Sequence, residues 1–466
     1  MLSDGTIIAL STPQGIGAIG VIRLSGPQAI EKTIFFFKPK GLKEWNKIQP
    51  NQVILGNFEK EGVLIDEVLI TPFKAPNSYT GEDVIEISCH GSPYILQQII
   101  SCYIDEGIKP AKPGEFTLRA YLNKKMNLSQ AEAVADLIAS ESAEAHRIAM
   151  QQMRGGFSKK MEKLRQQLIQ FKALIELELD FSEEEVNFAD KTELENILNK
   201  LDEEIQVLRN SFAYGNVIKK GVPVTIVGKP NVGKSSLLNA LFNEEKAIVS
   251  PIAGTTRDAI EDTLIIEGIQ YRFIDTAGLR HTEDTIESIG VAKAKEKVGQ
   301  ASILIYLYDK TIPAKKLAEE LSTLYREDLQ ILLIQNKIDL ELNGYDQMFC
   351  TSISKHLDPK IKVISLGIST KESESLIPMK KCLNEFVQSI GTNNGLIINN
   401  SRHFHALTEA LLSIENVKKA ILNDFPGDLL SVDLKEAIEH VGSITGNIDT
   451  DHDILGVIFS QFCIGK

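Results

Sequence analysis

The segment Gly228-Lys229-Pro230-Asn231-Val232-Gly233-Lys234-Ser235 constrains the fold of this chain more than any other. It follows a β-type run at residues 223–227 and leads into a run with helical spacing, the order that a phosphate-binding loop requires. Glycines let backbone N–H groups turn toward the phosphates, Lys234 can reach the outer phosphates, and Ser235 can ligate Mg²⁺. The segment predicts a nucleoside triphosphate site; a tight strand-to-helix turn with a surface lysine is the alternative.

Three later segments favour GTP as the nucleotide. Asp275-Thr276-Ala277-Gly278 ends a second β-type run, where the aspartate can hold Mg²⁺ through water and the glycine N–H can meet the γ-phosphate. Thr256, within Gly254-Thr255-Thr256-Arg257-Asp258, can close over the metal only while the γ-phosphate is present. Asn336-Lys337-Ile338-Asp339 follows a third apolar run and places a carboxylate where guanine, unlike adenine, offers two N–H donors. The predicted Mg²⁺ ligands are Ser235 and Thr256.

The residue that orients the attacking water is missing from its usual place. Ras-type enzymes carry a glutamine after the aspartate-to-glycine segment, whereas this chain has Leu279, which cannot orient water. A carboxylate at Glu283, Asp284 or Glu287 could polarise water, and a solvated acidic loop is an equally good interpretation. The developing charge also needs a cation. The arginine candidates are Arg257 and Arg280, which the sequence does not place.

Length and composition limit the remaining possibilities. A chain of 466 residues exceeds one domain and predicts three compact parts. Five cysteines without a Cys-x-x-Cys pair argue against a disulfide framework or a zinc site. No apolar span reaches membrane length and no leader pattern opens the chain, so we expect a reduced, soluble, cytoplasmic protein. A net charge of −13 argues against a general nucleic-acid binder.

Hydrophobic spacing predicts the parts on either side of the GTPase segment. Residues 6–10, 20–24 and 84–87 are β-type and residues 94–104 have helical spacing, which predicts an N-terminal α+β unit. A capping box at Ser129-Gln130-Ala131-Glu132 predicts the start of a helix. Helical stripes before the GTPase segment and after it predict one bundle interrupted by an inserted domain. The stripe expected on one long helix is Phe157, Met161, Leu164, Leu168, Phe171, Ile175 and Leu179.

The adjacent Cys89 and His90 lie in a predicted strand. Successive side chains of a strand point to opposite faces, so these two residues are not expected to form a catalytic pair. The first part of the chain thus reveals no catalytic pattern by itself.

The whole chain resembles the MnmE family, also called TrmE, of tRNA uridine-modification GTPases. Besides the GTPase motifs, the resemblance rests on Ala18-Ile19-Gly20-Val21-Ile22-Arg23-Leu24-Ser25-Gly26, Ser78-Tyr79-Thr80-Gly81-Glu82-Asp83, Pro113-Gly114-Glu115-Phe116-Thr117, Asp180-Phe181-Ser182-Glu183-Glu184 and Phe462-Cys463-Ile464-Gly465-Lys466. It implies a multidomain α/β protein with an α+β folate-binding and dimerisation domain (1–120), a helical domain in two parts (121–220 and 381–466) and an inserted Ras-like P-loop GTPase domain (221–380).

The resemblance also implies a function and partners. The family acts as a homodimer with a flavoprotein of the MnmG (GidA) family, in a heterotetramer. Using GTP, Mg²⁺, K⁺ and a reduced folate (5-formyl- or methylene-tetrahydrofolate), the complex adds an aminomethyl or carboxymethylaminomethyl group to C5 of the wobble uridine of certain tRNAs. The alternatives are an RNA-binding ribosome-assembly GTPase, which normally carries an RNA-binding module, and a structural or membrane GTPase, which normally carries a membrane-facing helix or lipid anchor.

Roles for individual residues are implied only by this resemblance. K⁺ would be held by the Asn231 side chain and by carbonyls around Ser250, Ile252 and Thr255, where it can replace an arginine finger. The water-orienting carboxylate aligns with Glu287. The implied GTP contacts are Asn231, Val232, Gly233, Lys234, Ser235, Ser236, Ser250, Pro251, Ile252, Ala253, Gly254, Thr255, Thr256, Asp275, Thr276, Ala277, Gly278, Asn336, Lys337, Asp339 and Ser365. The implied folate contacts are Arg23, Glu82, Lys125 and Lys466.

The resemblance makes Cys463 important for tRNA modification, as nucleophile, proton donor or structural thiol; prenylation fits poorly because Gly465 and a terminal lysine follow it. Near the base, where such GTPases show Ser-Ala-Lys or Ser-Ala-Arg, the chain is expected to depart from the pattern with Ser365-Leu366-Gly367. Ser250 replaces a common threonine, which matters little if only its carbonyl is used.

Overall fold

The fold is known from a computed structural model of the chain. It describes residues 5–41, 49–180, 191–244, 262–274, 295–309, 312–340, 345–391, 395–423, 425, 427–446 and 465. The chain divides into two compact units. Unit 1 contains Met1–Ala139, Met150–Leu201 and Glu409–Lys466, and unit 2 contains Ser140–Ala149 and Asp202–Thr408.

A seven-stranded sheet forms the N-terminal part of unit 1, with strand order β3-β4-β5-β6-β2-β1-β7. All its pairings are antiparallel except β1 with β7. Its strands are β1 (Ile7–Leu10), β2 (Ile19–Ser25), β3 (Phe37–Pro39), β4 (Ile54–Lys60), β5 (Val63–Phe73), β6 (Val84–His90) and β7 (Lys109–Pro110). The helices of this part are α1 (Ala29–Phe36), α2 (Pro93–Asp105) and α3 (Glu115–Leu122). The predicted strands and helix of this part are therefore present.

Helices cover one face of this sheet. On β2, the alternate residues Ile22 and Leu24 are fully buried and pack with Leu96 and Ile99 of α2 in one core. Arg23 lies between them and points to the opposite face. On β6, Cys89 is buried and its thiol contacts the Gly20 carbonyl, whereas His90 is exposed and bonds to Asp66, so the two do not form a pair.

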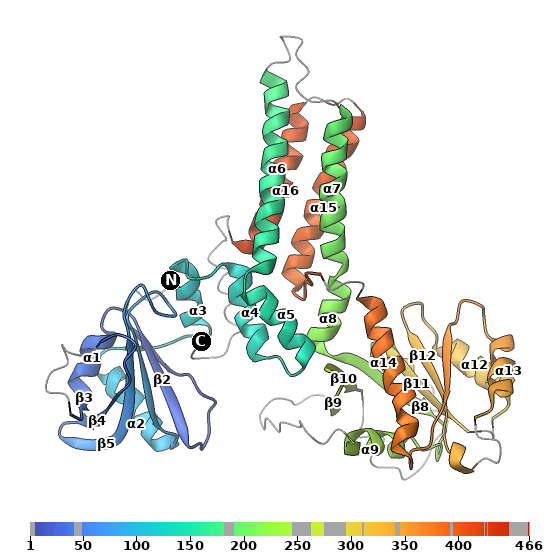
Figure 1. The fold of residues 1–466 in the computed structure, drawn as a ribbon, viewed down its shortest axis with the longest axis horizontal. Helices are drawn as coiled ribbons and strands as arrows, with labels where there is room; N and C mark the ends of the chain where they lie inside the picture. The colour runs from blue at the N-terminus through green and yellow to red at the C-terminus, as the bar shows by residue number, and fades with distance from the viewer. Residues whose placement is uncertain are drawn as a thin grey trace. The chain divides into compact units, whose positions relative to one another are not determined.

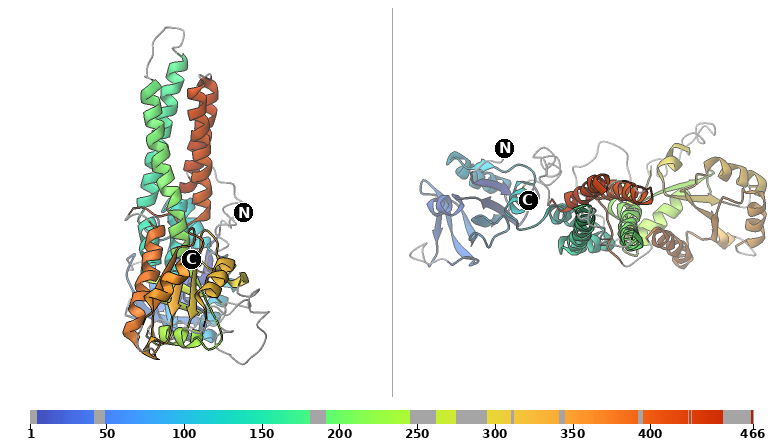
Figure 2. Two further views of the ribbon diagram at one scale, coloured as in Figure 1. Left: turned by 90° about the vertical axis from the view of Figure 1, so that its right-hand side faces the viewer. Right: turned by 90° about the horizontal axis from the view of Figure 1, so that it is seen from above.

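Long helices make up the rest of unit 1. Their bounds are α4 (Leu128–Ile138), α5 (Ala143–Met153), α6 (Gly156–Asp180), α7 (Lys191–Asn210), α15 (Ser401–Leu422) and α16 (Gly427–Thr445), of which α5, α7 and α15 also extend into unit 2. Helix α16 lies alongside α6 in Figure 1 and again in Figure 2. The predicted stripe of α6, from Phe157 to Ile175, is buried as expected. The side chain of Leu179 lies outside the described residues.

The capping box at the start of α4 was predicted two residues too late. The N-cap is Asn127, whose side chain accepts a hydrogen bond from the Gln130 N–H, while the Gln130 side chain accepts one from the Asn127 N–H. Ser129 is already helical, and its hydroxyl donates to the Asn127 side chain at 3.0 Å. An asparagine caps as well as a serine, so the pattern alone favoured the wrong residue.

A six-stranded sheet forms the centre of unit 2, with strand order β13-β12-β11-β8-β10-β9 (Figure 1). Its pairings are parallel except for β9 at the edge, which pairs antiparallel with β10. The strands are β8 (Val222–Gly228), β9 (Asp262–Ile266), β10 (Ile269–Phe273), β11 (Ile303–Tyr308), β12 (Gln330–Gln335) and β13 (Val363–Gly367). The helices are α8 (Phe212–Lys220), α9 (Lys234–Glu244), α12 (Ala314–Leu324), α13 (Gln347–His356) and α14 (Ile377–Ile390), with short 3₁₀ turns η3 (Ile338–Leu340) and η4 (Ser373–Leu376).

Helices cover both faces of this sheet, which explains the continuous apolar runs of its strands. All six residues of β11 are buried. Ile303, Ile305 and Leu307 pack in one core with α9 and α14, while Leu304, Tyr306 and Tyr308 pack in the other with α12 and α13. The result is a three-layer α/β unit whose parallel strands end on the side where the predicted GTP motifs lie.

Candidate functional site

The phosphate loop connects the end of β8 to the start of α9. Lys234 is the first residue of α9, and the half-buried Ser235 and exposed Ser236 follow it in the first turn. The N-terminus of a helix attracts anions because its N–H groups are free and its dipole end is positive. Gly233 has φ +101°, and an added Cβ there would collide with the side-chain nitrogen of Asn336. The glycine is therefore required both for its conformation and for the close approach of a neighbouring loop.

Lys234 lies folded over the phosphate loop. Its Nζ donates to the carbonyls of Gly228 at 2.8 Å and Lys229 at 2.7 Å. Burial lowers the pKa of the lysine, and the charge of Lys297 lowers it further. An anion in the loop would counter both effects, so this lysine has more to gain from a phosphate than an exposed one.

Two side chains tie the phosphate loop to the Asn336-Lys337-Ile338-Asp339 segment. Asn336, which is 3% exposed, donates from Nδ2 to the Val232 carbonyl at 2.7 Å. Lys337 donates from Nζ to the Asn231 carbonyl at 2.7 Å. The two motifs, about a hundred residues apart in sequence, thus form one site in the structure. The sequence predicted that both line a nucleotide site, and the structure brings them into direct contact.

The serine beside Asp339 is Ser369 and not Ser365. Ser365 lies within β13, paired with Leu333, before the strand reaches its end. The Ser369 hydroxyl donates to Asp339 Oδ1 at 3.0 Å, and Lys371 Nζ lies 3.2 Å from Oδ2. The expectation that the chain departs from the Ser-Ala-Lys pattern at Ser365-Leu366-Gly367 is therefore corrected. The segment that lies beside Asp339 is Ser369-Thr370-Lys371, which keeps the serine and the lysine of that pattern. This segment begins four residues after Ser365 in the sequence.

These contacts also set the charge of the predicted base-reading carboxylate. The hydrogen bond with Lys371, followed by that from Ser369, lowers the pKa of Asp339 from its ordinary value. An ionised carboxylate accepts hydrogen bonds only. Asp339 is therefore an acceptor at neutral pH, which is the state that two N–H donors of guanine require.

Several predicted site residues lie outside the described residues. They are Ser250, Pro251, Ile252, Ala253, Gly254, Thr255, Thr256, Asp275, Thr276, Ala277, Gly278, Glu287, Cys463 and Lys466. Within the described part of the chain, no group of three or more histidine, cysteine or acidic side chains could hold a metal ion. None of its helices is long and apolar enough to cross a membrane.

A second polar cluster lies on the face of the N-terminal sheet opposite its apolar core. Arg23 contacts Oε1 of Glu86 on the neighbouring strand through Nε at 3.0 Å and Nη2 at 2.7 Å. Its guanidinium lies 5.2 Å from the Tyr79 ring centre and 5.7 Å from that of Phe116. The two rings and the carboxylate hold the arginine in one position. Glu86, Tyr79 and Phe116 were not predicted as site residues.

Glu82 lies beside this arginine. It accepts a hydrogen bond from Ser25 at 2.7 Å and another from Arg119 at 2.9 Å. Ser25 lies two residues from Arg23, on the same face of β2. Arg119 is 5% exposed and also bonds to Glu115 and the Gly5 carbonyl. The exposed Lys125 donates to the Pro76 carbonyl at 2.8 Å and lies next to Gly81. The structure thus brings Arg23, Glu82 and Lys125 to one region.

The C-terminal end of the chain reaches the same sheet. The Ser11 hydroxyl donates to the Gly465 carbonyl at 3.2 Å. Gly465 has φ +96°, and an added Cβ would collide with the Leu10 carbonyl, so only glycine fits there. The contact places the residue between Cys463 and Lys466 against β1.

Comparisons with known proteins agree on one family. The model of the MnmE helical domain matches residues 128–463, and that of the GTP-binding protein TrmE N-terminus matches residues 6–125. A tRNA modification GTPase MnmE of Cytophaga hutchinsonii is 49% identical over 99% of this chain and 98% of that protein. Proteins of the same name from Flavobacterium johnsoniae and Bacteroides fragilis are 48% and 46% identical over the full length of both chains. The solved G domain of T. maritima FeoB is 25% identical over 36% of this chain and 99% of that chain, but its TM-score of 0.26 supports no argument.

Proposed function

The chain belongs to the MnmE family, and from this premise we propose that it is a GTP hydrolase that modifies tRNA. With a flavoprotein of the MnmG family it adds an aminomethyl or carboxymethylaminomethyl group to C5 of the wobble uridine. A reduced folate supplies the one-carbon unit. Because tRNA is the substrate, the activity belongs in the cytoplasm.

The contact of the base-reading segment with the phosphate loop carries the proposal for GTP. Asn336 and Lys337 donate hydrogen bonds to the carbonyls of Val232 and Asn231, so the segment that carries the Asp339 carboxylate is held against the phosphate loop. Asp339, ionised and oriented by Ser369, accepts the two N–H donors of guanine. Binding of the base therefore supports the loop conformation that binds the phosphates.

The residues around the phosphate loop fit two cations. Lys337 donates a hydrogen bond to the backbone carbonyl of Asn231, and the Asn231 side chain is exposed. The side-chain oxygen of Asn231 binds K⁺ together with the carbonyls of Ser250, Ile252 and Thr255. Ser235, at the helix N-terminus, holds Mg²⁺ together with Thr256. The cations supply the positive charge that the phosphates need during hydrolysis. Glu287 orients the attacking water, since Leu279 cannot.

The N-terminal cluster fits a folate. The guanidinium of Arg23 and the ammonium groups of Lys125 and Lys466 suit the carboxylates of its glutamate tail. The carboxylate of Glu82 accepts hydrogen bonds from the donor edge of the pterin, because the hydrogen bonds from Ser25 and Arg119 stabilise its negative charge. Gly465 contacts the same sheet through Ser11. This contact supports a role in the one-carbon chemistry for Cys463, which precedes Gly465 by two residues in the sequence.

The domain organisation and assembly follow from the same proposal. The N-terminal domain (1–120) mediates a homodimer, and the G domain (221–380) is inserted between the two parts of the helical domain. The homodimer and the flavoprotein partner together form a heterotetramer that receives the tRNA.

Reconstitution tests the proposal. Purified protein is mixed with the partner flavoprotein, GTP, K⁺ and Mg²⁺ salts, methylene-tetrahydrofolate, ammonium or glycine as the source of the amine nitrogen, and an unmodified tRNA transcript. The wobble nucleoside is identified by mass spectrometry. The proposal expects a modified uridine that disappears when GTP or the folate is omitted. A product formed equally well without GTP would refute the role of the GTPase, and one formed without folate would refute that of the N-terminal site.

A further inference from the structure

We propose that the turn between β9 and β10 and the N-terminus of α5 form the joint through which the state of the nucleotide acts on the helical domain. Glu144 is its positioning residue. The inference rests on the proposed function, because it assigns the path by which that GTPase acts on the rest of the chain.

The β9–β10 hairpin connects the joint to both segments that meet the γ-phosphate. In sequence, β9 follows the segment that contains Thr256, and β10 ends two residues before Asp275. A displacement of either segment would therefore displace the same two strands. Their far end is a tight turn at Glu267 and Gly268, with φ +50° and +80°. Such a two-residue turn fixes the register of the hairpin, so the hairpin moves as one piece.

The loop between β9 and β10 supplies a hydrogen-bond acceptor to the first helical turn of α5. The Gly268 carbonyl accepts the Glu144 N–H at 3.2 Å, and Ser142 accepts the Ala145 N–H at 3.2 Å. Each of these N–H groups lies in the first turn and lacks a partner within its own helix. Next to them, Gln270 on β10 donates to Glu141 at 2.6 Å. The hairpin thus supplies part of the hydrogen bonding that starts this helix.

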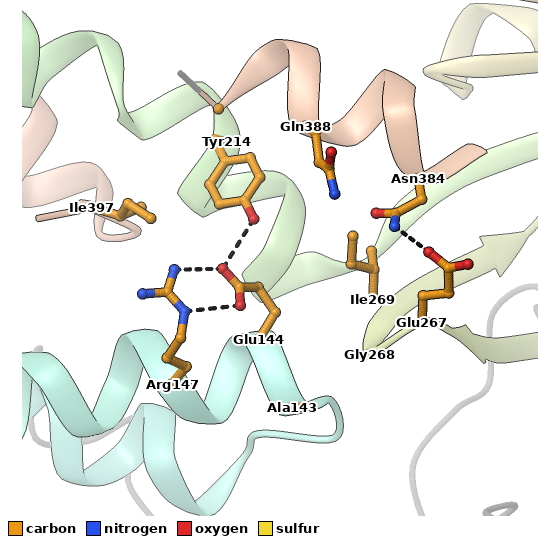
Figure 3. Close-up of a pocket in the computed structure, with 11 residues that line it drawn as sticks. Ala143, Glu144, Arg147, Tyr214, Glu267, Gly268, Ile269, Asn384, Gln388 and Ile397 are labelled. Carbon is orange, nitrogen blue, oxygen red and sulfur yellow. Dashed lines mark hydrogen bonds and ion pairs between the residues drawn. The ribbon is translucent and has the colours of Figure 1, made fainter. Parts of the chain in front are cut away.

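Two side chains hold Glu144 in position, one from α5 itself and one from α8 (Figure 3). Arg147 contacts it through two nitrogens, at 2.9 and 2.5 Å, and the Tyr214 hydroxyl of α8 donates to it at 3.0 Å. The pKa of Glu144 is lowered by Arg147 first and by Tyr214 as well. Tyr214 packs on Gly391, where an added Cβ would collide with the ring. A polar pocket of about 730 Å³ borders this cluster, so its groups have room to shift.

The same cluster is fixed to other elements of unit 2 on the other side of the turn. Asn384 of α14 donates to the Glu267 side chain. Ile148 of α5 is 1% exposed and packs in the core shared by α9 and α14. The boundary between the two compact units falls within α5, after Ala149. Since a helix is rigid over three turns, a shift of its capped end is passed along it toward the helical part of unit 1.

The experiment compares Glu144→Gln and Tyr214→Phe with matched controls. Glu415→Gln removes an exposed helix ion pair, and Tyr325→Phe removes an exposed hydroxyl contact, both away from the joint. In purified protein, GTP turnover of all four variants should stay within about twofold of wild type. In a strain lacking the wild-type gene, wobble-uridine modification should fall by about tenfold with the two joint variants only.

A second measurement separates this inference from the proposed function. Hydrogen exchange of the peptide that covers α5 is recorded with GDP and with a non-hydrolysable GTP analogue. The inference expects a nucleotide-dependent difference in wild type that Tyr214→Phe reduces, whether or not tRNA is the substrate. No difference in wild type, unchanged tRNA modification, or a parallel loss of GTP turnover in the joint variants would overturn it. Absence of tRNA modification in wild type, with the exchange difference intact, would refute only the proposed function.

Discussion

Replacing Gly233 with alanine should weaken GTP binding through two separate effects. The residue has φ +101°, a region that costs a residue with a side chain about 1–2 kcal/mol. The new methyl group would also collide with Asn336 Nδ2, which donates to the Val232 carbonyl. Losing that buried hydrogen bond costs a further 1–2 kcal/mol, roughly. The sum, about 2–4 kcal/mol, corresponds to a Kd for GTP that is roughly thirty to a thousand times higher.

Titration with a fluorescent GTP analogue measures this loss, and a double-mutant cycle separates its parts. Asn336→Ala removes the atom that the methyl group meets, so the cost of Gly233→Ala should be smaller in that background by about 1 kcal/mol. Gly299→Ala is the matched control, because an added Cβ at Gly299 has no atom within 4 Å. Additive effects of the two substitutions, or near-wild-type affinity of Gly233→Ala, would refute the account of how the two loops fit together.

Three further predictions concern other parts of the molecule. Arg119→Met should lower the free energy of unfolding by about 3–5 kcal/mol because it leaves the buried Glu115 without its ion-pair partner. Denaturant titration measures this loss. The control Lys60→Met breaks an exposed ion pair with Asp105 and should lower the free energy of unfolding by only about 0–1 kcal/mol. The pKa of Glu144 is lowered in the folded state, so the ionised carboxylate stabilises the protein above the unfolded pKa near 4.5, and this stabilisation is lost as the pH falls. In thermal unfolding between pH 7 and pH 3, Glu144→Gln should therefore lose less stability than wild type. The same loss of stability with pH in both proteins would contradict this. GTP turnover should fall roughly a hundredfold when Na⁺ replaces K⁺ in wild type, and Asn231→Ala should abolish the difference; equal rates of wild type in both salts would remove the K⁺ site.

The GTP motifs and most regular elements could be predicted because the signals are local. The apolar runs at residues 223–227 and 331–334 became β8 and β12 because strands covered on both faces need continuous apolar sequence. The stripe from Phe157 to Ile175 became the buried side of α6 because a helix with this spacing has one apolar face.

The errors and omissions arose where the outcome depends on distant residues or where several residue types fit one local position. Ser365 was predicted near the base because the sequence does not tell where β13 ends, and the contact with Asp339 identifies Ser369 instead. Asn127 was overlooked as the cap of α4 because several residue types can fill that position. The association of residues 140–149 with unit 2 rests on Ile148 and on the Gly268 carbonyl, which no periodicity reveals. The pairing of Arg23 with Glu86 depends likewise on the register of β2 and β6.

The central claim is that GTP bound at this site drives modification of the tRNA wobble uridine. Mass spectrometry of tRNA nucleosides, from a strain lacking the gene and from the same strain complemented with wild type or Gly233→Ala, tests it most directly. The account predicts unmodified wobble uridines in the null strain, restoration by wild type and little restoration by Gly233→Ala. Normally modified wobble uridines in the null strain would contradict it.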